Sequence, residues 1–366
     1  MQDTQPYRRV RSPHARPMRP IRNDTRPRAN WARRLKITGF VVLIVLIAVV
    51  VLGWMRASAF NDAVSDQPSL SMRLFGPLAG GDRVNVLLLG YSDDSRDGGY
   101  LSDSMNVISV DRATDTTSII PIPRDMWVEG LPEVPQNIKI NEAFRIGYYE
   151  AGFSFGGELA SKAVSQVTGL RIDGWISLDF QGFHAMVDAV GGITLENPRA
   201  FSYTWTDDEW AAGIFHSSFA AGTLELDGEL ALDYARTRYA DIPEEHGDFA
   251  RLERQQRVMR AIRDKVTGWQ MLPRGLAALD ALEGHLRTNL PVLDLAMLFG
   301  KLDADHRIEL DDLLQPTTNT LGQFIFVVAG ASSSADYSPL HAYIEDQLST
   351  PPSPSPAQSG HESPVP

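Results

Sequence analysis

The sequence predicts a mixed α/β domain built of α-β-α layers, in which helices flank a central mixed sheet, preceded by a single transmembrane helix. Three observations support this prediction. Residues 37–55 carry no charge, strand-like and helix-like segments alternate from residue 83 to about residue 195, and helical patterns dominate residues 227–303. Alternation of strands and helices is typical of layered α/β folds.

The uncharged run 37–55 is long enough to cross a membrane. Nineteen helical residues, at about 1.5 Å each, span roughly the 30 Å hydrocarbon core. Residues 1–36 carry eleven Lys or Arg and two Asp, which places the N-terminus in the cytoplasm by the positive-inside rule. A cleaved signal peptide is the alternative, because residues 57–59 match an A-x-A site, but the leader and the apolar core are long for one. We therefore expect a single-pass plasma-membrane protein whose remainder lies outside the cell.

The net charge and the absence of cysteine exclude several classes of protein. The formal net charge is −12, so subtracting the leader's +9 leaves about −21 for the rest of the chain. Such an acidic outer domain is a poor nucleic-acid binder, so we expect no nucleic-acid partner, and the leader is explained by topology and contact with anionic membrane lipid. The chain has no cysteine, which excludes disulfides and thiol nucleophiles and fits a bacterial cell envelope.

The chain beyond the membrane run divides into three parts. Residues 56–81 are polar and rich in Gly and Pro, which predicts a stalk. Residues 82–343 form the outer domain. Residues 344–366 are rich in Ser and Pro, which predicts a disordered tail.

Strands in the outer domain are predicted from short β-branched and leucine runs bounded by turn residues. The first three are at 83–89, 104–110 and 117–122. Helical periodicity at 158–167 and 180–190 flanks a further strand at 175–178, and a strand at 193–195 follows Gly191 and Gly192.

Two later segments carry less regular signals. Residues 198–222 are aromatic and irregular, which predicts an insertion or lid and not a core element. The apolar run 324–328 predicts a last strand that closes the sheet.

An acidic loop follows the first predicted strand. Asp93, Asp94 and Asp103 lie between two buried strands, at the carboxyl end of a strand, where α/β folds bind ligands. Two carboxylates brought together there would hold Mg²⁺, which takes its other ligands from water and phosphate. A solvated, Gly-rich turn is the alternative. Dinucleotide-binding, P-loop, serine-hydrolase and zincin motifs are absent from the sequence.

A basic pair is predicted to face inward on the helix at 249–266, for which Asp248 is a suitable N-cap. Winding at 100° per residue places Arg251 and Gln255 on the same arc as the apolar side chains of this helix. Arg254, Arg257, Arg260 and Arg263 fall outside that arc. An inward guanidinium needs an anionic partner, either a ligand or a structural carboxylate.

Three further arginines are candidates for the same anion. Arg236 and Arg238 are alternate residues that would project in one direction from an extended segment, and Arg124 lies in a turn after the third strand. Arginine binds phosphate bidentately, so together these side chains predict a cradle for a phosphate ester bound through Mg²⁺.

The motifs, in order, are NVLLLG, LSDSMNVISVD, IPIPRDMWV, KINEAF, FHAMVDAVGGITLENP, LDGELALDYARTR and GDFARLERQQRV. Across residues 82–265 this order resembles the LytR-CpsA-Psr family. The resemblance implies a membrane-anchored phosphotransferase that moves a glycopolymer, such as a teichoic acid, from a polyprenyl-pyrophosphate carrier onto peptidoglycan during cell wall assembly. It also implies an apolar tunnel for the polyprenyl chain.

The resemblance assigns roles to individual residues. It implies that Asp103 binds Mg²⁺, with Mn²⁺ as the alternative ion. The family's other loop aspartate meets Ser92 here, so Asp94 is the expected second ligand and Asp93 its alternate. The implied pyrophosphate-binding residues are Arg124, Arg236, Arg238, Arg251 and Gln255, and those expected to act in catalysis are Asp103, Arg124 and Arg251. Arg96 and Lys139 match further basic positions.

Other functions remain open at this level. The same site would serve a polyprenyl-pyrophosphate hydrolase, in which water replaces the sugar hydroxyl. A non-catalytic lipid-carrier-binding or scaffold protein of the envelope is the third possibility. A transcription regulator conflicts with the expected topology, because only residues 1–36 would be cytoplasmic.

The charge asymmetry yields a test of topology. Protease added to intact protoplasts is expected to remove nearly everything beyond the stalk, because residues after Arg56 should lie outside. Immunoblotting with antibodies to each end measures this. A protected outer domain, or a mature N-terminus at Phe60, would contradict the anchor.

Overall fold

The computed structural model describes residues 82–92, 99–206, 214–266, 277–278, 280–291, 294–295, 298 and 306–350. The chain divides into two units, Met1–Met55 and Arg56–Pro366, and every described residue belongs to the second. The predicted leader, transmembrane run and stalk lie outside the described residues, as do residues 351–366 of the predicted tail. None of the helices within the described ranges is long and apolar enough to span a membrane.

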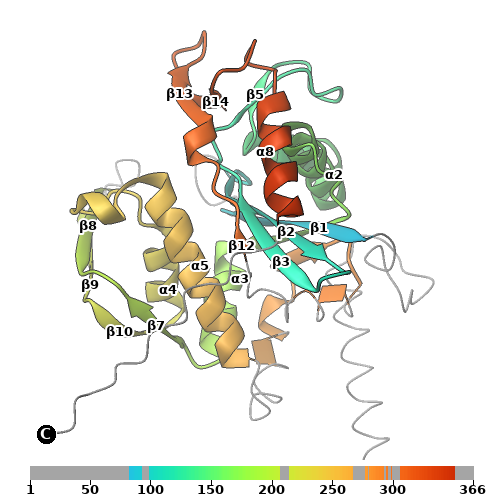
Figure 1. The fold of residues 1–366 in the computed structure, drawn as a ribbon. Coiled ribbons are helices and arrows are strands. Elements are labelled where there is room, and N and C mark those ends of the chain that lie inside the picture. Colours follow the sequence, from blue (N-terminus) through green and yellow to red (C-terminus); the bar gives the residue numbers. More distant parts are fainter. Residues whose placement is uncertain are drawn as a thin grey trace, which may run out of the picture. The chain divides into compact units, whose positions relative to one another are not determined.

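The centre of the described part is a mixed six-stranded sheet with the order β11-β6-β1-β2-β3-β12. Four of its strands, β1, β2, β3 and β12, are labelled in Figure 1. β1 runs antiparallel to β2 and parallel to β6, β2 is antiparallel to β3, and β12 is parallel to β3. The strands are β1 (Arg83–Tyr91), β2 (Ser102–Asp111), β3 (Thr116–Pro121), β6 (Gly174–Asp179), β11 (Leu286–Thr288) and β12 (His306–Arg307).

Both faces of this sheet are covered, as the apolar runs predict. Leu87 and Leu89 of β1 belong to a core cluster with residues of helices α2 (Glu142–Thr168) and α8 (Ser338–Ser349). Alternate residues of β1, such as Val86, belong to a cluster on the opposite face, which Met259 of helix α5 (Gly247–Val266) joins. Successive side chains of β1 therefore point to opposite faces of the sheet and pack against helices on each side. This is the α-β-α arrangement.

Helix α2 begins well before the predicted helix and is sharply bent. Ala151 and Gly152 have non-helical backbone angles, and Gly152 has φ +85°. Because of this bend, a Cβ on Gly147 would lie 2.7 Å from the carbonyl oxygen of Phe155. Only glycine permits such close approach and positive φ without strain.

A second layer of helices and short strands packs around its own core cluster. α3 and α4 contact each other, and α4 and β7 both contact α5. Asp179 and Asp227 cap α3 and α4 by accepting hydrogen bonds from Gly182 N and Leu230 N. The elements are α3 (Phe180–Ala189), β7 (Ile193–Asn197), β8 (Phe201–Thr206), β9 (Ile214–Phe219), β10 (Gly222–Leu226), α4 (Gly228–Arg236), the 3-10 turn η3 (Pro243–Glu245) and α5 (Gly247–Val266).

The remaining short elements form two hairpin-like pairs, β4 with β5 and β13 with β14, and one 3-10 turn. They are β4 (Trp127–Val128), β5 (Ile138–Lys139), the 3-10 turn η5 (Asp311–Leu313), β13 (Leu314–Thr318) and β14 (Phe324–Val328).

The structure corrects two predictions about these segments. The described parts of this segment, residues 198–206 and 214–222, are largely strand and not irregular, because β8 pairs with β9 and β10 pairs with β7. The strand at 324–328 forms but does not close the sheet. It pairs with β13 as a hairpin, in which the side chain of Asn319 accepts hydrogen bonds from Leu321 N and Gln323 N, and β12 lies beside β3 instead. Pairing with β13, which is joined to β14 by a short turn, costs less loop-closure entropy than pairing with the distant edge of the central sheet.

Helix α8 extends the folded region. Leu340 and Ile344 are fully buried in the first cluster, and the helix continues past residue 343, where the sequence predicts the tail to begin. Arg83 fixes its C-terminal end by donating to the carbonyl oxygen of Leu348 at 3.0 Å and to Asp111 at 2.8 Å.

Candidate functional site

A bulge places Asp103 at the carboxyl end of β1. Gly90 pairs with Ser104 and Tyr91 with Ser102, so Asp103 is the extra residue between two ladder positions. Bulges bend a strand and redirect a side chain next to functional sites. The carboxylate is partly exposed, at the strand end where the sequence predicts ligand binding.

Arg124 forms an ion pair with this aspartate. Its NH1 group lies 2.5 Å from Asp103 Oδ1. The backbone of Asn141 joins the two segments, because its carbonyl accepts from Ser102 N at 3.1 Å and its amide donates to the carbonyl of Arg124 at 3.3 Å. The pair is thus held by main-chain contacts as well as by charge.

Asp125 gathers three cations and was not assigned a role from the sequence. Its buried carboxylate lies 2.7 Å from Lys139 Nζ, 3.5 Å from Arg124 Nε and 3.8 Å from an NH2 nitrogen of Arg238. Its carbonyl accepts from Phe326 N at 2.9 Å, which anchors the turn to β14. The feature of the sequence that could have pointed to Asp125 is its position immediately after Arg124, which was itself a predicted site residue. Two carboxylates, Asp103 and Asp125, among these three cations leave one excess positive charge, which favours an anionic ligand.

Helix α5 contributes the inward pair that winding predicts. Arg251 is 7% exposed, and Gln255 lies one turn further along the helix. The Gln255 Oε1 atom accepts from Ser104 Oγ at 2.9 Å, next to Asp103, and its Nε2 donates to the carbonyl of Ala235 at 3.4 Å. Gln255 therefore joins β2 to the end of α4.

Arg236 and Arg238 flank the buried Thr237 and have different surroundings. The guanidinium of Arg236 lies 4.7 Å from the ring centroid of Phe180, at the start of α3. Arg238 extends to Asp125. The structure thus brings Arg238 to the Asp103–Arg124 pair, whereas Arg236 lies beside the carboxyl end of β6, the neighbour of β1.

A buried ion pair supports the segment that carries both arginines. Arg254 and Glu245 are each 0% exposed and are joined at 2.8 Å. Arg254 also donates to the carbonyls of Tyr234, Thr237 and Glu245. Burial lowers the pKa of the Arg254 guanidinium and the adjacent Glu245 opposes that shift. Arginine retains its proton in proteins, so the pair is charged.

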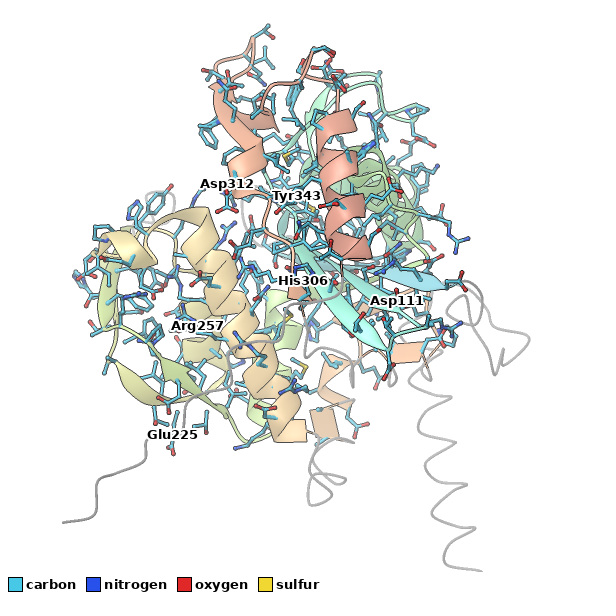
Figure 2. The ribbon with its side chains drawn as sticks, in the orientation of Figure 1. Asp111, Glu225, Arg257, His306, Asp312 and Tyr343 are labelled. Carbon is cyan, nitrogen blue, oxygen red and sulfur yellow. The ribbon has the colours of Figure 1, made fainter. Side chains whose placement is uncertain are left out.

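The prediction that Arg254 and Arg257 lie outside the buried face of α5 is therefore wrong. Arg257, labelled on α5 in Figure 2, donates to the hydroxyl of Tyr234 at 2.5 Å and lies 3.5 Å from Glu245. Helix α5 has more than one buried face, because it packs against both the second layer and the central sheet. Arg260 is exposed as predicted.

The metal ligands are only partly described. Asp93, Asp94 and Arg96 lie outside the described residues, so the second ligand stays a prediction. The described residues contain no group of three His, Cys, Asp or Glu side chains placed to hold a metal. Mg²⁺ is commonly bound through one or two carboxylates plus substrate phosphate, so the hard oxygens of Asp103 beside an anion cradle fit this ion.

Aromatic rings gather next to the bulge. Tyr91 packs against Phe144 with ring centroids 5.0 Å apart, and Tyr100 stacks on Tyr148 at 3.8 Å. Burial raises the pKa of the Tyr91 phenol, and the nearby Asp179 adds to this rise. The group lies beside the bend in α2. The apolar tunnel that the resemblance implies stays a prediction.

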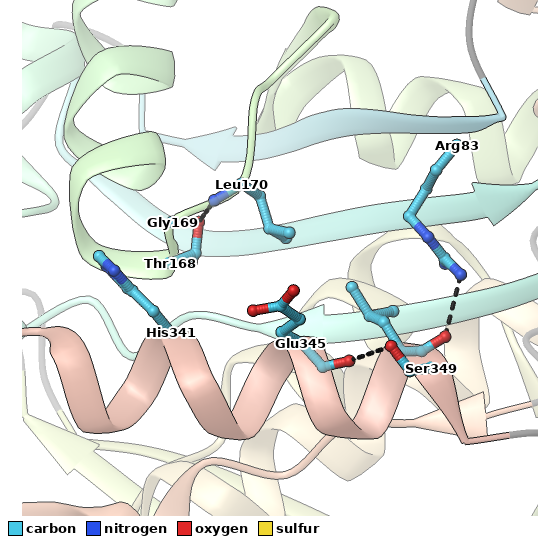
Figure 3. Close-up of a pocket in the computed structure, with 8 residues that line it drawn as sticks. Arg83, Thr168, Gly169, Leu170, His341, Glu345 and Ser349 are labelled. Atoms are coloured by element: carbon cyan, nitrogen blue, oxygen red, sulfur yellow. Dashed lines mark hydrogen bonds between the residues drawn. The ribbon is translucent and has the colours of Figure 1, made fainter.

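A hollow of about 450 Å³ lies elsewhere, at the start of β1 (Figure 3). Arg83 lines it and pairs across the sheet with Asp111, at the opposite end of β2 from Asp103. It is therefore separate from the candidate site. Its other lining residues are Thr168, Gly169, Leu170, His341, Glu345, Leu348 and Ser349.

Comparison with known families places the chain. The model of the LytR_cpsA_psr family matches residues 53–336. The chain belongs to the LytR-CpsA-Psr family. This match covers all the residues that form the Asp103–Arg124–Asp125 cluster and the inward pair on α5.

Two similar proteins are both named polyisoprenyl-teichoic acid–peptidoglycan teichoic acid transferase TagU. The protein from Oceanobacillus iheyensis is 33% identical over 218 residues, which are 59% of this chain and 62% of that protein. The chain therefore spans less than two thirds of that relative's length. The protein from Enterococcus faecalis is 29% identical over 277 residues, which are 72% of this chain and 84% of that protein.

A solved structure has the same fold. The crystal structure of TagU from B. subtilis matches with a TM-score of 0.52 at 23% identity, over 75% of this chain and 100% of that chain. The mixed α/β fold with a central mixed sheet between helices, predicted from the sequence, is confirmed.

The buried pair gives a test of how the site is supported. Arg254→Ala is expected to lower the free energy of unfolding by about 3–5 kcal/mol, because Glu245 and three carbonyls lose their donor. The exposed Arg260 provides the matched control on the same helix, where the change to Ala should stay within about 0.5 kcal/mol. Urea denaturation of each variant measures both. Equal effects would contradict the assigned role of Arg254.

Proposed function

We propose that this protein is a membrane-anchored, Mg²⁺-dependent phosphotransferase that moves a glycopolymer from a polyprenyl-pyrophosphate carrier onto peptidoglycan. The observation that carries this proposal is the cluster of Asp103, Arg124, Asp125 and Arg238 at the carboxyl end of β1. Membership of the family and the names of the TagU relatives support the substrate class.

The cluster suits a pyrophosphate. Guanidinium groups form paired, charge-assisted hydrogen bonds to phosphate oxygens. The three cations also outnumber the two carboxylates that contact them, Asp103 and Asp125. Arg251 adds a guanidinium near the first turn of α5, where the helix dipole also favours an anion. Several phosphate oxygens can therefore be bound at once.

Transfer needs positioning and charge stabilisation more than covalent help from the protein. A sugar hydroxyl of the acceptor attacks the phosphorus that carries the polymer, the bond to the bridging pyrophosphate oxygen breaks, and polyprenyl phosphate leaves. The hydroxyl proton passes to solvent or a nearby base. Arg124, Arg238 and Arg251 offset the charge that develops on the phosphate oxygens.

Asp103 is the proposed metal ligand, together with Asp94 or Asp93 of the neighbouring loop. Mg²⁺ bound there supplies charge neutralisation on the pyrophosphate. Arg124 contacts Oδ1 of Asp103 and so fixes the orientation of the carboxylate. The apolar 37–55 run is the proposed anchor, which would keep the site near a lipid-linked donor at the outer membrane face.

The metal prediction concerns Asp103→Asn, which keeps the size of the side chain but removes its charge. Transfer of labelled glycopolymer to soluble peptidoglycan is expected to fall roughly 100- to 1,000-fold, and EDTA should abolish the wild-type activity. The partly exposed ion pair with Arg124 contributes little, so unfolding should shift by about 1 kcal/mol or less. Full transfer in EDTA would contradict metal dependence, and release of free polymer without transfer would identify a hydrolase.

The inward arginine yields a second prediction. Arg251→Ala should reduce kcat/KM roughly 30- to 1,000-fold, because a charge-assisted contact to a phosphate oxygen is lost. Arg251→Lys should restore part of it, since lysine keeps the charge but not the planar fork. Steady-state transfer assays measure both variants. Arg260→Ala is the control and should leave kcat/KM unchanged, so an equal loss there would refute the assignment.

A further inference from the structure

Tyr239 presents a large aromatic ring to solvent directly beside the arginine cluster. The residue is 63% exposed, although it follows the half-buried Arg238 in the chain. The guanidinium of Arg238 lies 5.7 Å from the centroid of the Tyr239 ring and 3.8 Å from Asp125. Tyr239 therefore contacts Arg238, which is one of the cations proposed to bind the pyrophosphate.

Contacts with His246 hold the Tyr239 ring in place. Tyr239 forms an antiparallel bridge with His246, and the two rings make an edge contact with centroids 5.7 Å apart. The imidazole Nδ1 of His246 donates to the carbonyl of Ala240 at 2.9 Å, and Gly247 N donates to the carbonyl of Arg238 at 2.7 Å. The backbone on both sides of Tyr239 is thus tied down, so its exposed ring pays little ordering entropy when a ligand binds.

We propose that Tyr239 is a platform on which a pyranose ring of the substrate stacks. Sugar rings present a face of C–H groups, which pack against the electron-rich face of an aromatic ring. Tyrosine suits this because it supplies rigid contact area with few rotatable bonds. The inference rests on the proposed transferase function, and the sugar belongs either to the acceptor glycan or to the polymer being transferred.

Three substitutions at Tyr239 separate the contribution of the aromatic face from those of apolar bulk and of the hydroxyl group. Tyr239→Ala removes the ring, Tyr239→Leu keeps apolar bulk without an aromatic face, and Tyr239→Phe keeps the ring without the hydroxyl. Leu230→Ala is the control, because Leu230 is another exposed apolar side chain but lies on α4 outside the cluster. Each change is made in the full-length chain in mild detergent.

Steady-state transfer is measured with lipid-linked glycopolymer as donor and soluble, uncross-linked peptidoglycan strands as acceptor. Tyr239→Ala and Tyr239→Leu are expected to raise one KM roughly 5- to 15-fold with little change in kcat, whereas Tyr239→Phe and Leu230→Ala stay near wild type. A rise in the acceptor KM assigns the platform to the acceptor, and a rise in the donor KM assigns it to the polymer. Unchanged values for both substrates, or an equal loss in Tyr239→Phe, would overturn the proposal.

A binding assay separates this inference from the proposed function. Calorimetric titration with a chitin tetrasaccharide tests stacking without any transfer, and the affinity should fall in Tyr239→Ala but persist in Asp103→Asn. Tyr239-dependent binding in a protein that transfers nothing would support the platform while the transferase proposal fails. Absence of tetrasaccharide binding to the wild type, together with an unchanged donor KM in Tyr239→Ala, would overturn the platform even if transfer is observed.

Discussion

The ion pair between Arg254 and Glu245 is the interaction on which the candidate site depends most. Both side chains are removed from water, where an unpaired charge would be very costly. Arg254 meets this constraint by binding Glu245 and the carbonyls around Thr237, which lies between Arg236 and Arg238. The same side chain belongs to α5, the helix of Arg251 and Gln255, so one buried charge aligns two segments that supply site residues.

A second buried carboxylate, Asp125, holds the cations of the site together. Asp125 keeps Arg124, Lys139 and Arg238 together, because three cations would otherwise repel one another. The balance is locally positive although the chain as a whole carries −12. An acidic exterior with a basic cluster directs anions to one place, and the exposed ring of Tyr239 at its margin adds a surface suited to sugar.

Much of the framework was predictable because burial leaves a clear pattern. The strands β1, β2, β3 and β6 of the central sheet are largely buried and were located within a few residues. The short edge strands β11 and β12 were not predicted, and β11 lies in a segment that was expected to be helical. Asp179 and Asp227 follow simple capping rules. The inward position of Arg251 followed from helical winding. Contacts between distant segments could not be predicted in this way, which is why β14 was assigned to the wrong sheet.

The sequence by itself determined the alternation of the core strands, the inward pair on α5 and, through its ordered motifs, the family. Only the tertiary structure decided that Asp103 lies on a bulge, that Asp125 gathers the cations and that Arg254 is buried. The physical reason is that the hydrophobic periodicity of a sequence shows only which side chains share the main apolar face of a helix or strand. A helix packed on two sides, or a carboxylate neutralised by partners from three separate segments, becomes visible only when those segments are brought together.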